Sequence, residues 1–277
     1  MAYLKDILPL LSMKAGSIMT QSLTTARNAL QILKAFTPEQ PEWGVRELSS
    51  HLGSSRSTTH LLLSTLASEG FLMQSSDRRY RLGWAIFELG SVFLSGLELR
   101  EEALPVMRRL NQRFNEIVHV AVLDHGEAVY VEKVASARSM PLFTRMGLRY
   151  PAHCTGVGKV LLAHGPETVL RDISLVPFTP HTIIDPQVFR QELKCIRDVG
   201  VAYDREETLV GLSCVAAPIY DFTGEVIAAL SISLPTVRFL PTESSLTEAV
   251  KEAACEISRS LGYLPNARGY RFAIPGA

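Results

Sequence analysis

Residues 45–83 constrain the fold of this chain more than any other stretch. They contain a short amphipathic run that ends at Gly53, a second run that starts with Ser54 and Ser55, and two short alternating runs around polar residues 75–78. Glycine often ends a helix, serine often caps the next one, and alternation of apolar and polar residues indicates strands. This order predicts a winged helix-turn-helix, whose second helix has the right size for the major groove of DNA.

The flanking sequence extends this first domain on both sides. Apolar residues at helical spacing predict a helix over residues 24–36, with Ser22 or Thr24 as its cap. Helices are predicted from Val45 to Gly53 and from Ser55 to Gly70, followed by strands over 71–74 and 79–82. A further helix over residues 84–97 has a generous apolar surface, so we expect it to link two domains and to form a dimer contact.

From Leu99 onward the pattern changes to helices mixed with hairpins. Helices are predicted over residues 99–114, 156–164, 166–173, 186–199 and 242–261. Strands are predicted over 117–123, 128–134, 201–204, 212–220 and 225–234, with another near Leu142. The chain is therefore expected to have an α+β fold, in which the second domain is built on a mixed sheet flanked by helices. The expected divisions are an N-terminal extension (1–20), a winged helix-turn-helix (21–83), a linker helix (84–98), a second domain (99–262) and a C-terminal tail (263–277).

Composition excludes several classes of protein. Hydrophobic residues make up 47% and charged residues 20% of the 277, which is typical of a packed globular protein. Four separated cysteines without a Cys-x-x-Cys pair argue against a disulfide framework or a zinc ribbon. No apolar run is long enough to span a bilayer, and the N-terminus is a poor secretion signal. We therefore expect a cytoplasmic protein without metal, cofactor or membrane contact.

The predicted second helix of the motif and the hairpin carry the candidate DNA-binding side chains. Net charge is zero over the chain, and residues 21–83 hold seven basic against five acidic residues, so placement matters more than total charge. Arginine can bond guanine, while serine, threonine and histidine can reach base edges or phosphates. The alternatives are an ordinary solvated helix start and ordinary turn solubility. The candidates are Arg46, Ser55, Arg56, Ser57, Thr58, Thr59, His60, Arg78 and Arg79.

A glycine-bearing turn marks a candidate ligand site in the second domain. The sequence Thr155-Gly156-Val157-Gly158 opens a predicted helix, so free backbone N–H groups and the positive end of the helix dipole would face an anion there. Small polar side chains beside such a turn suit a small carboxylate, for example a keto acid or an aromatic acid.

These motifs together resemble the IclR family of bacterial transcriptional regulators. The resemblance covers residues 21–262 and rests on motifs in a fixed order, among them STTH at 57–60, YRLG at 80–83, PAHCTGVGK at 151–159, FTPHTI at 178–183, DREE at 204–207 and GLSCVAAPI at 211–219. It implies a winged helix-turn-helix joined by a helix to a GAF-like effector domain, assembled as a homodimer or a dimer of dimers on a pseudo-palindromic double-stranded operator.

The resemblance also implies an effector site and exposes one departure. The positions that line the family's effector site correspond to Cys154, Thr155, Gly156, Val157, Asp204, Cys214, Ser231 and Ser233. The alternative is that these residues have only a structural role, since serines at alternate positions belong to one face of a sheet and buried cysteines act as small hydrophobes. The family commonly has arginine directly after the residue matching His60, whereas this chain has Leu61.

An enzyme is the competing interpretation. His153, Cys154, Asp204 and Cys214 contain the residue types of a thiol triad or a metal cluster, but their spacing is not diagnostic of either. A purely architectural DNA-binding protein would not need the large second domain. The sequence therefore predicts a ligand-responsive DNA-binding regulator with no catalytic residues.

Overall fold

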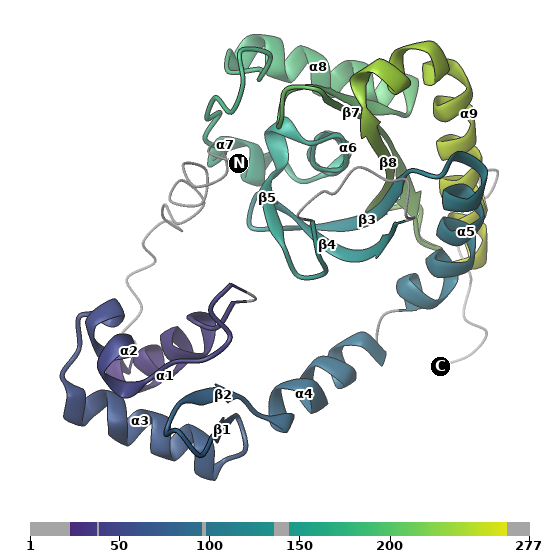
Figure 1. The fold of residues 1–277 in the computed structure, drawn as a ribbon. Coiled ribbons are helices and arrows are strands. Elements are labelled where there is room, and N and C mark those ends of the chain that lie inside the picture. The colour runs from purple at the N-terminus through teal and green to yellow at the C-terminus, as the bar shows by residue number, and fades with distance from the viewer. Residues whose placement is uncertain (1–22, 38, 96–97, 136–143, 265–277) are drawn as a thin grey trace, which may run out of the picture. The chain divides into compact units, whose positions relative to one another are not determined.

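The structure is a computed structural model that describes residues 23–37, 39–95, 98–135 and 144–264. The described residues form two compact units, one ending at residue 95 and the other starting at Glu98 (Figure 1). The strand expected near Leu142, the N-terminal extension and nearly all of the C-terminal tail lie outside the described residues.

The first unit is a small helical core with a hairpin. It contains α1 (Thr24–Lys34), α2 (Val45–Leu52), α3 (Arg56–Ser68), β1 (Leu72–Gln74), β2 (Tyr80–Leu82) and α4 (Trp84–Ser95). Its core forms where one apolar side chain from each of five elements meets the others, namely Ile32, Leu48, Leu63, Leu72 and Tyr80. All five are at most 2% exposed, so the two strands are packed onto the helices and the hairpin is an integral part of this unit.

Local capping fixes the turn between α2 and α3. Gly53 ends α2 with a φ of 63°, a left-handed conformation that glycine adopts without steric cost. Ser55 then caps α3, because its Oγ accepts a hydrogen bond from the backbone N–H of Thr58 at 3.1 Å. The cap expected for α1 is different. Leu23 occupies the cap position without a side-chain hydrogen bond, so the prediction of a Thr24 cap was wrong, while Ser22 lies outside the described residues.

The second unit is built on one six-stranded antiparallel sheet with the order β5-β4-β3-β8-β7-β6. The strands are β3 (Ile117–Asp124), β4 (Glu127–Val134), β5 (Arg149–Pro151), β6 (Ala202–Arg205), β7 (Leu212–Tyr220) and β8 (Val226–Pro235). His125 and Gly126, both with positive φ, form the tight turn that joins β3 to β4. The expected α+β fold class is confirmed.

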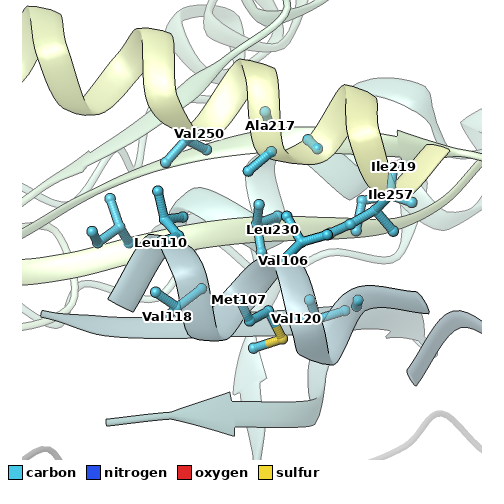
Figure 2. Close-up of a cluster of buried hydrophobic side chains, with 14 of the residues drawn as sticks. Val106, Met107, Leu110, Val118, Val120, Ala217, Ile219, Leu230, Val250 and Ile257 are labelled. Atoms are coloured by element: carbon cyan, nitrogen blue, oxygen red, sulfur yellow. The ribbon is translucent and has the colours of Figure 1, made fainter. Parts of the chain in front are cut away.

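Helices cover both faces of this sheet. On one face lie α5 (Glu98–Phe114) and α9 (Thr236–Ser260), and Figure 2 shows their apolar side chains meeting those of β3, β7 and β8. On the other face lies α6 (Gly156–His164), over which α8 (Pro186–Val199) packs (Figure 1). The first face is almost wholly apolar, whereas the face toward α6 also contains buried polar groups, and these define the candidate ligand site.

Two helices of the second unit differ from their predicted bounds. The helix α7 (Glu167–Arg171) is shorter than the segment predicted over 166–173. The last helix starts at Thr236 rather than at Thr242, and Pro241 lies inside its second turn, where few intrahelical bonds are lost. None of the described helices combines the length and apolar character that a membrane span requires.

Candidate nucleic-acid interface and ligand pocket

The start of α3 presents most of the predicted DNA-binding side chains to solvent. Arg56, Ser57, Thr58 and His60 are exposed. Thr59 is only 1% exposed, because it lies on the same side of the helix as the core residue Leu63. Its Oγ1 donates to the backbone oxygen of Ser55 at 3.0 Å, so Thr59 does not belong to the exposed front, contrary to the expectation from sequence.

The exposed side chains differ in whether they already have partners. Ser55 is used in capping, and its hydroxyl also donates to Thr58 Oγ1 at 2.9 Å. Among the described residues, Arg56, Ser57 and His60 have no hydrogen-bonding or ionic partner for their side chains. A guanidinium, a hydroxyl and an imidazole are therefore available on one helix front to an external partner.

The hairpin tip holds two adjacent arginines with different environments. Arg78 is exposed and has a φ of 63° in the turn between β1 and β2. The guanidinium of Arg79 instead donates to Glu47 at 2.8 and 3.2 Å and to the backbone oxygen of Glu42 at 3.1 Å. The hydrogen bonds from Arg79 lower the pKa of Glu47. Arg79 thus joins the hairpin to the start of α2, while Arg78 and the exposed Arg46 remain open to solvent.

In the second unit, the sheet register brings most of the predicted effector residues together. Asp204 pairs with Cys214, which pairs with Ser233, so these three lie side by side across β6, β7 and β8. Ser231 lies two residues along β8 and therefore faces the same side of the sheet. All four side chains are at most 8% exposed.

The start of α6 packs against the row formed by Asp204, Cys214 and Ser233. Thr155 caps the helix by accepting from the N–H of Gly158 at 3.1 Å, and Cys154, Thr155 and Val157 are at most 4% exposed. A Cβ on Gly156 would lie only 2.7 Å from Cys214 Sγ, so only glycine allows this approach of the helix to β7. All eight predicted effector residues are therefore buried, four just before or at the start of α6 and four on the neighbouring face of the sheet.

Burial sets the charge of the groups in this region. It raises the pKa of Asp204 to about 7, with the nearby Glu207 adding to the effect, although Asp204 Oδ1 accepts from the N–H of Glu207 at 2.7 Å. Burial also raises the pKa of Cys214 to about 12 and moves that of Cys154 upward. Both thiols stay protonated at neutral pH, which does not suit nucleophilic catalysis. No group of three metal-ligating side chains occurs within the described part of the chain.

Two aromatic residues of the same region were not predicted. His119 pairs with Ser231 across β3 and β8, is 1% exposed, and hydrogen-bonds through Nε2 to Thr144 Oγ1 at 2.8 Å. Its ring centroid lies 4.8 Å from that of Tyr130. Burial lowers the pKa of His119 to about 3, so its imidazole is neutral. Alternation with the apolar Val118 and Val120 was the available sequence signal, because it places His119 on the opposite face.

A buried ion pair anchors α6 beside the site. Lys159 Nζ lies 2.5 Å from Glu207 Oε1 and 3.0 Å from Glu192 Oε1, and its side chain is 1% exposed. Burial alone would lower the pKa of Lys159, but the two carboxylates outweigh this effect and raise it. His153, the other residue of the enzyme alternative, bonds through Nε2 to the backbone oxygen of Val176 at 2.9 Å.

Comparison with known proteins agrees with this two-part organisation. The family model described as the IclR helix-turn-helix domain matches residues 25–76, and that described as the bacterial transcriptional regulator IclR C-terminal matches residues 92–259. The HTH-type transcriptional regulator XynR of Escherichia coli K12 is 34% identical over 247 residues, covering 87% of this chain and 98% of XynR.

Solved structures of related proteins also match both parts of this chain. The Thermotoga maritima IclR structure matches with a TM-score of 0.74 and 33% identity, covering 87% of this chain and 100% of that one. An IclR homologue from Microbacterium hydrocarbonoxydans, solved as a complex with 4-hydroxybenzoate, matches with a TM-score of 0.77 and 29% identity, covering 86% and 99%. Each of these two structures therefore covers both domains of this chain, and both are named as IclR proteins.

Proposed function

The chain belongs to the IclR family of bacterial transcriptional regulators, and we propose that it binds a pseudo-palindromic operator with an affinity that a small organic carboxylate controls. It carries the helix-turn-helix domain and the effector domain of such regulators. The relatives are named as regulators and not as enzymes. We place its action in the cytoplasm, where the four cysteines, all free, would remain reduced.

The observation that carries the DNA-binding part is the set of unpartnered side chains on the front of α3. Arg56, Ser57 and His60 stand where the recognition helix of a helix-turn-helix meets base edges. Arg78 at the hairpin tip and Arg46 on α2 are exposed and suit phosphate contacts. We leave Thr59 out of this set because it is buried, and we assign Arg79 to holding the hairpin in place.

The effector part rests on the buried polar side chains where the start of α6 meets the sheet. Backbone N–H groups at the start of α6 and the hydroxyls of Ser231 and Ser233 can donate to a carboxylate. Asp204 can do so as well when protonated, which its raised pKa favours. The complex of a homologue with 4-hydroxybenzoate supports an organic acid as the ligand class.

Two copies of the chain are needed to read two half-sites. The linker helix α4 exposes Trp84 and Phe87 at 68% and 67%, and a partner subunit would cover these side chains in a homodimer or a dimer of dimers. The carboxylate would then change the placement of the two α3 helices by its differential affinity for two arrangements of the dimer.

The proposal can be tested with purified protein in two assays. A thermal-shift screen of 4-hydroxybenzoate and aliphatic 2-keto acids should find a ligand that raises the melting temperature, because binding to the native state stabilises it. Binding of that ligand should weaken in Ser231→Ala and Cys214→Val, while their operator affinity without ligand stays at the wild-type value. If both variants keep full ligand affinity and full response, the effector site has been placed wrongly.

A further inference from the structure

We propose that Leu61 on α3 contacts the 5-methyl group of a thymine in each operator half-site, so that this chain recognises thymine through an apolar contact at that position. This inference rests on the proposed DNA-binding function and adds one specificity-determining residue to it. It starts from the exposure of Leu61, whose side chain is 67% exposed on a helix that otherwise turns its leucines toward the core.

Helix geometry places Leu61 in the middle of the exposed face. At 100° per residue, Leu61 lies about 160° around the helix from Leu63, which is fully buried. Ser57 lies one turn before Leu61 on the same stripe, whereas His60 lies about 100° and Arg56 about 140° around the helix from Leu61. A duplex that meets the unpartnered side chain of Ser57 therefore also meets Leu61.

The hydroxyls that follow Leu61 are already used within the helix. Ser64 Oγ donates to the backbone oxygen of His60 at 2.8 Å, and Thr65 Oγ1 donates to the backbone oxygen of Leu61 at 2.9 Å. Their protons are thus not available to base edges. The surface around Leu61 therefore offers apolar contact, in contrast to the free polar groups at the start of the helix.

The major groove presents one apolar group that fits such a surface. Each base pair displays donors and acceptors there, and only thymine adds a methyl group. A leucine side chain can make no hydrogen bond to a base edge, so a contact from Leu61 favours the base that carries the methyl group. Leu61 lies about 7.5 Å along the helix axis from Arg56, which corresponds to about two base-pair steps.

The test uses the duplex that the wild-type protein selects from a randomised pool. Each thymine of the selected duplex is replaced by deoxyuridine, which removes only the methyl group, at both symmetric half-site positions. At one such pair of positions the wild-type protein should lose affinity by about fourfold per half-site, the change that burial of one methyl group supports. Replacement of the other thymines should have little effect.

Three variants then assign the methyl contact to its side chain. Leu61→Ala should bind the thymine duplex as weakly as wild type binds the deoxyuridine duplex, with no further loss on deoxyuridine. It should fold normally, since the site is exposed and alanine favours helices. Arg56→Ala should bind more weakly but keep the deoxyuridine penalty. Val188→Ala removes an exposed apolar side chain from α8 and should behave as wild type.

The outcomes separate this inference from the function on which it rests. If wild type selects a specific duplex but no methyl group matters, or if Leu61→Ala keeps the wild-type penalty, the thymine contact is refuted and the DNA-binding function stands. If no sequence is enriched from the pool, the proposed function itself fails, and the inference fails with it.

Discussion

Two neighbouring arginines at the hairpin tip have separate tasks because only one has intramolecular partners. Arg79 is bound to Glu47 and to the backbone of Glu42, whereas Arg78 projects from a turn into solvent. A cation that is already paired gives up those bonds before it can contact a phosphate. The adjacent positions are indistinguishable in sequence, and their roles became clear only from the packing of the hairpin against α2.

Arg78 should therefore contribute a phosphate contact to operator binding. Arg78→Gln should weaken binding to all duplexes alike and reduce the slope of log K against log salt by about 1 per protomer. Fluorescence anisotropy between 50 and 200 mM salt would measure this slope. Arg79→Gln is the matched control, and its salt slope should stay closer to wild type. Equal changes in both variants would contradict the assignment.

The protonation of Asp204 should couple ligand binding to pH. Its pKa is raised to about 7, and a bound carboxylate would favour the protonated form further. Affinity for the carboxylate should then fall as pH rises above about 7, approaching about tenfold per pH unit, and level off below it. Calorimetric titrations from pH 6 to 8.5 test this sign. Asp204→Asn should flatten the profile, and an equally steep profile in that variant would exclude Asp204 as the coupled group.

At the scale of elements, α6 is tied to the loop after β6 by the buried pair of Lys159 and Glu207. Lys159→Ala would leave Glu207 buried without its cation, so we expect the free energy of unfolding of the second unit to drop by about 3–5 kcal/mol. Urea denaturation would measure this. The double variant Lys159→Met with Glu207→Leu should recover most of the loss, since it removes both charges. No recovery would show that the lysine acts through something other than this pair.

Elements whose ends are fixed by local chemistry could be predicted from the sequence. The ends of α2 and α8 follow from glycines with positive φ, and the start of α3 from its serine cap. The start of α9 could not be predicted in this way, because Pro241 indicates a helix start while the preceding turn is held by packing of Phe239 in the core. Tertiary contacts decide such cases.

The sites were predictable to different degrees for the same reason. Resemblance to a family suggested the candidate effector positions, and the sheet register places three of them, Asp204, Cys214 and Ser233, side by side. Thr59 was predicted as a DNA-binding residue because its hydroxyl could reach a base edge or a phosphate, but its side chain faces the core. His119 was missed, since a lone histidine in an apolar strand carries no motif.

For the whole molecule, several apolar side chains of α4 have no cover among the described residues. Phe87 is 67% exposed, and a charge there would be incompatible with a buried helix contact between subunits. Phe87→Glu should shift the protein toward monomers in sedimentation and weaken operator binding, because one protomer reads one half-site. The control Ile184→Glu changes an exposed position of the second unit and should leave both sedimentation and operator binding unchanged. Unchanged sedimentation of Phe87→Glu would rule out α4 as the dimer contact.

The two units of one chain must influence each other if the account is correct. Linkage requires that a ligand which changes operator affinity has its own affinity changed by the operator by the same factor. A typical coupling corresponds to a change of about 5- to 150-fold.

The most direct test compares the dissociation constants for the selected operator and a scrambled duplex, with and without the carboxylate found by thermal shift, at 150 mM salt. We predict that wild type prefers the operator by at least about a thousandfold in one ligand state and that the ligand changes operator affinity without changing scrambled-duplex affinity. Equal binding to both duplexes in both ligand states would contradict the account.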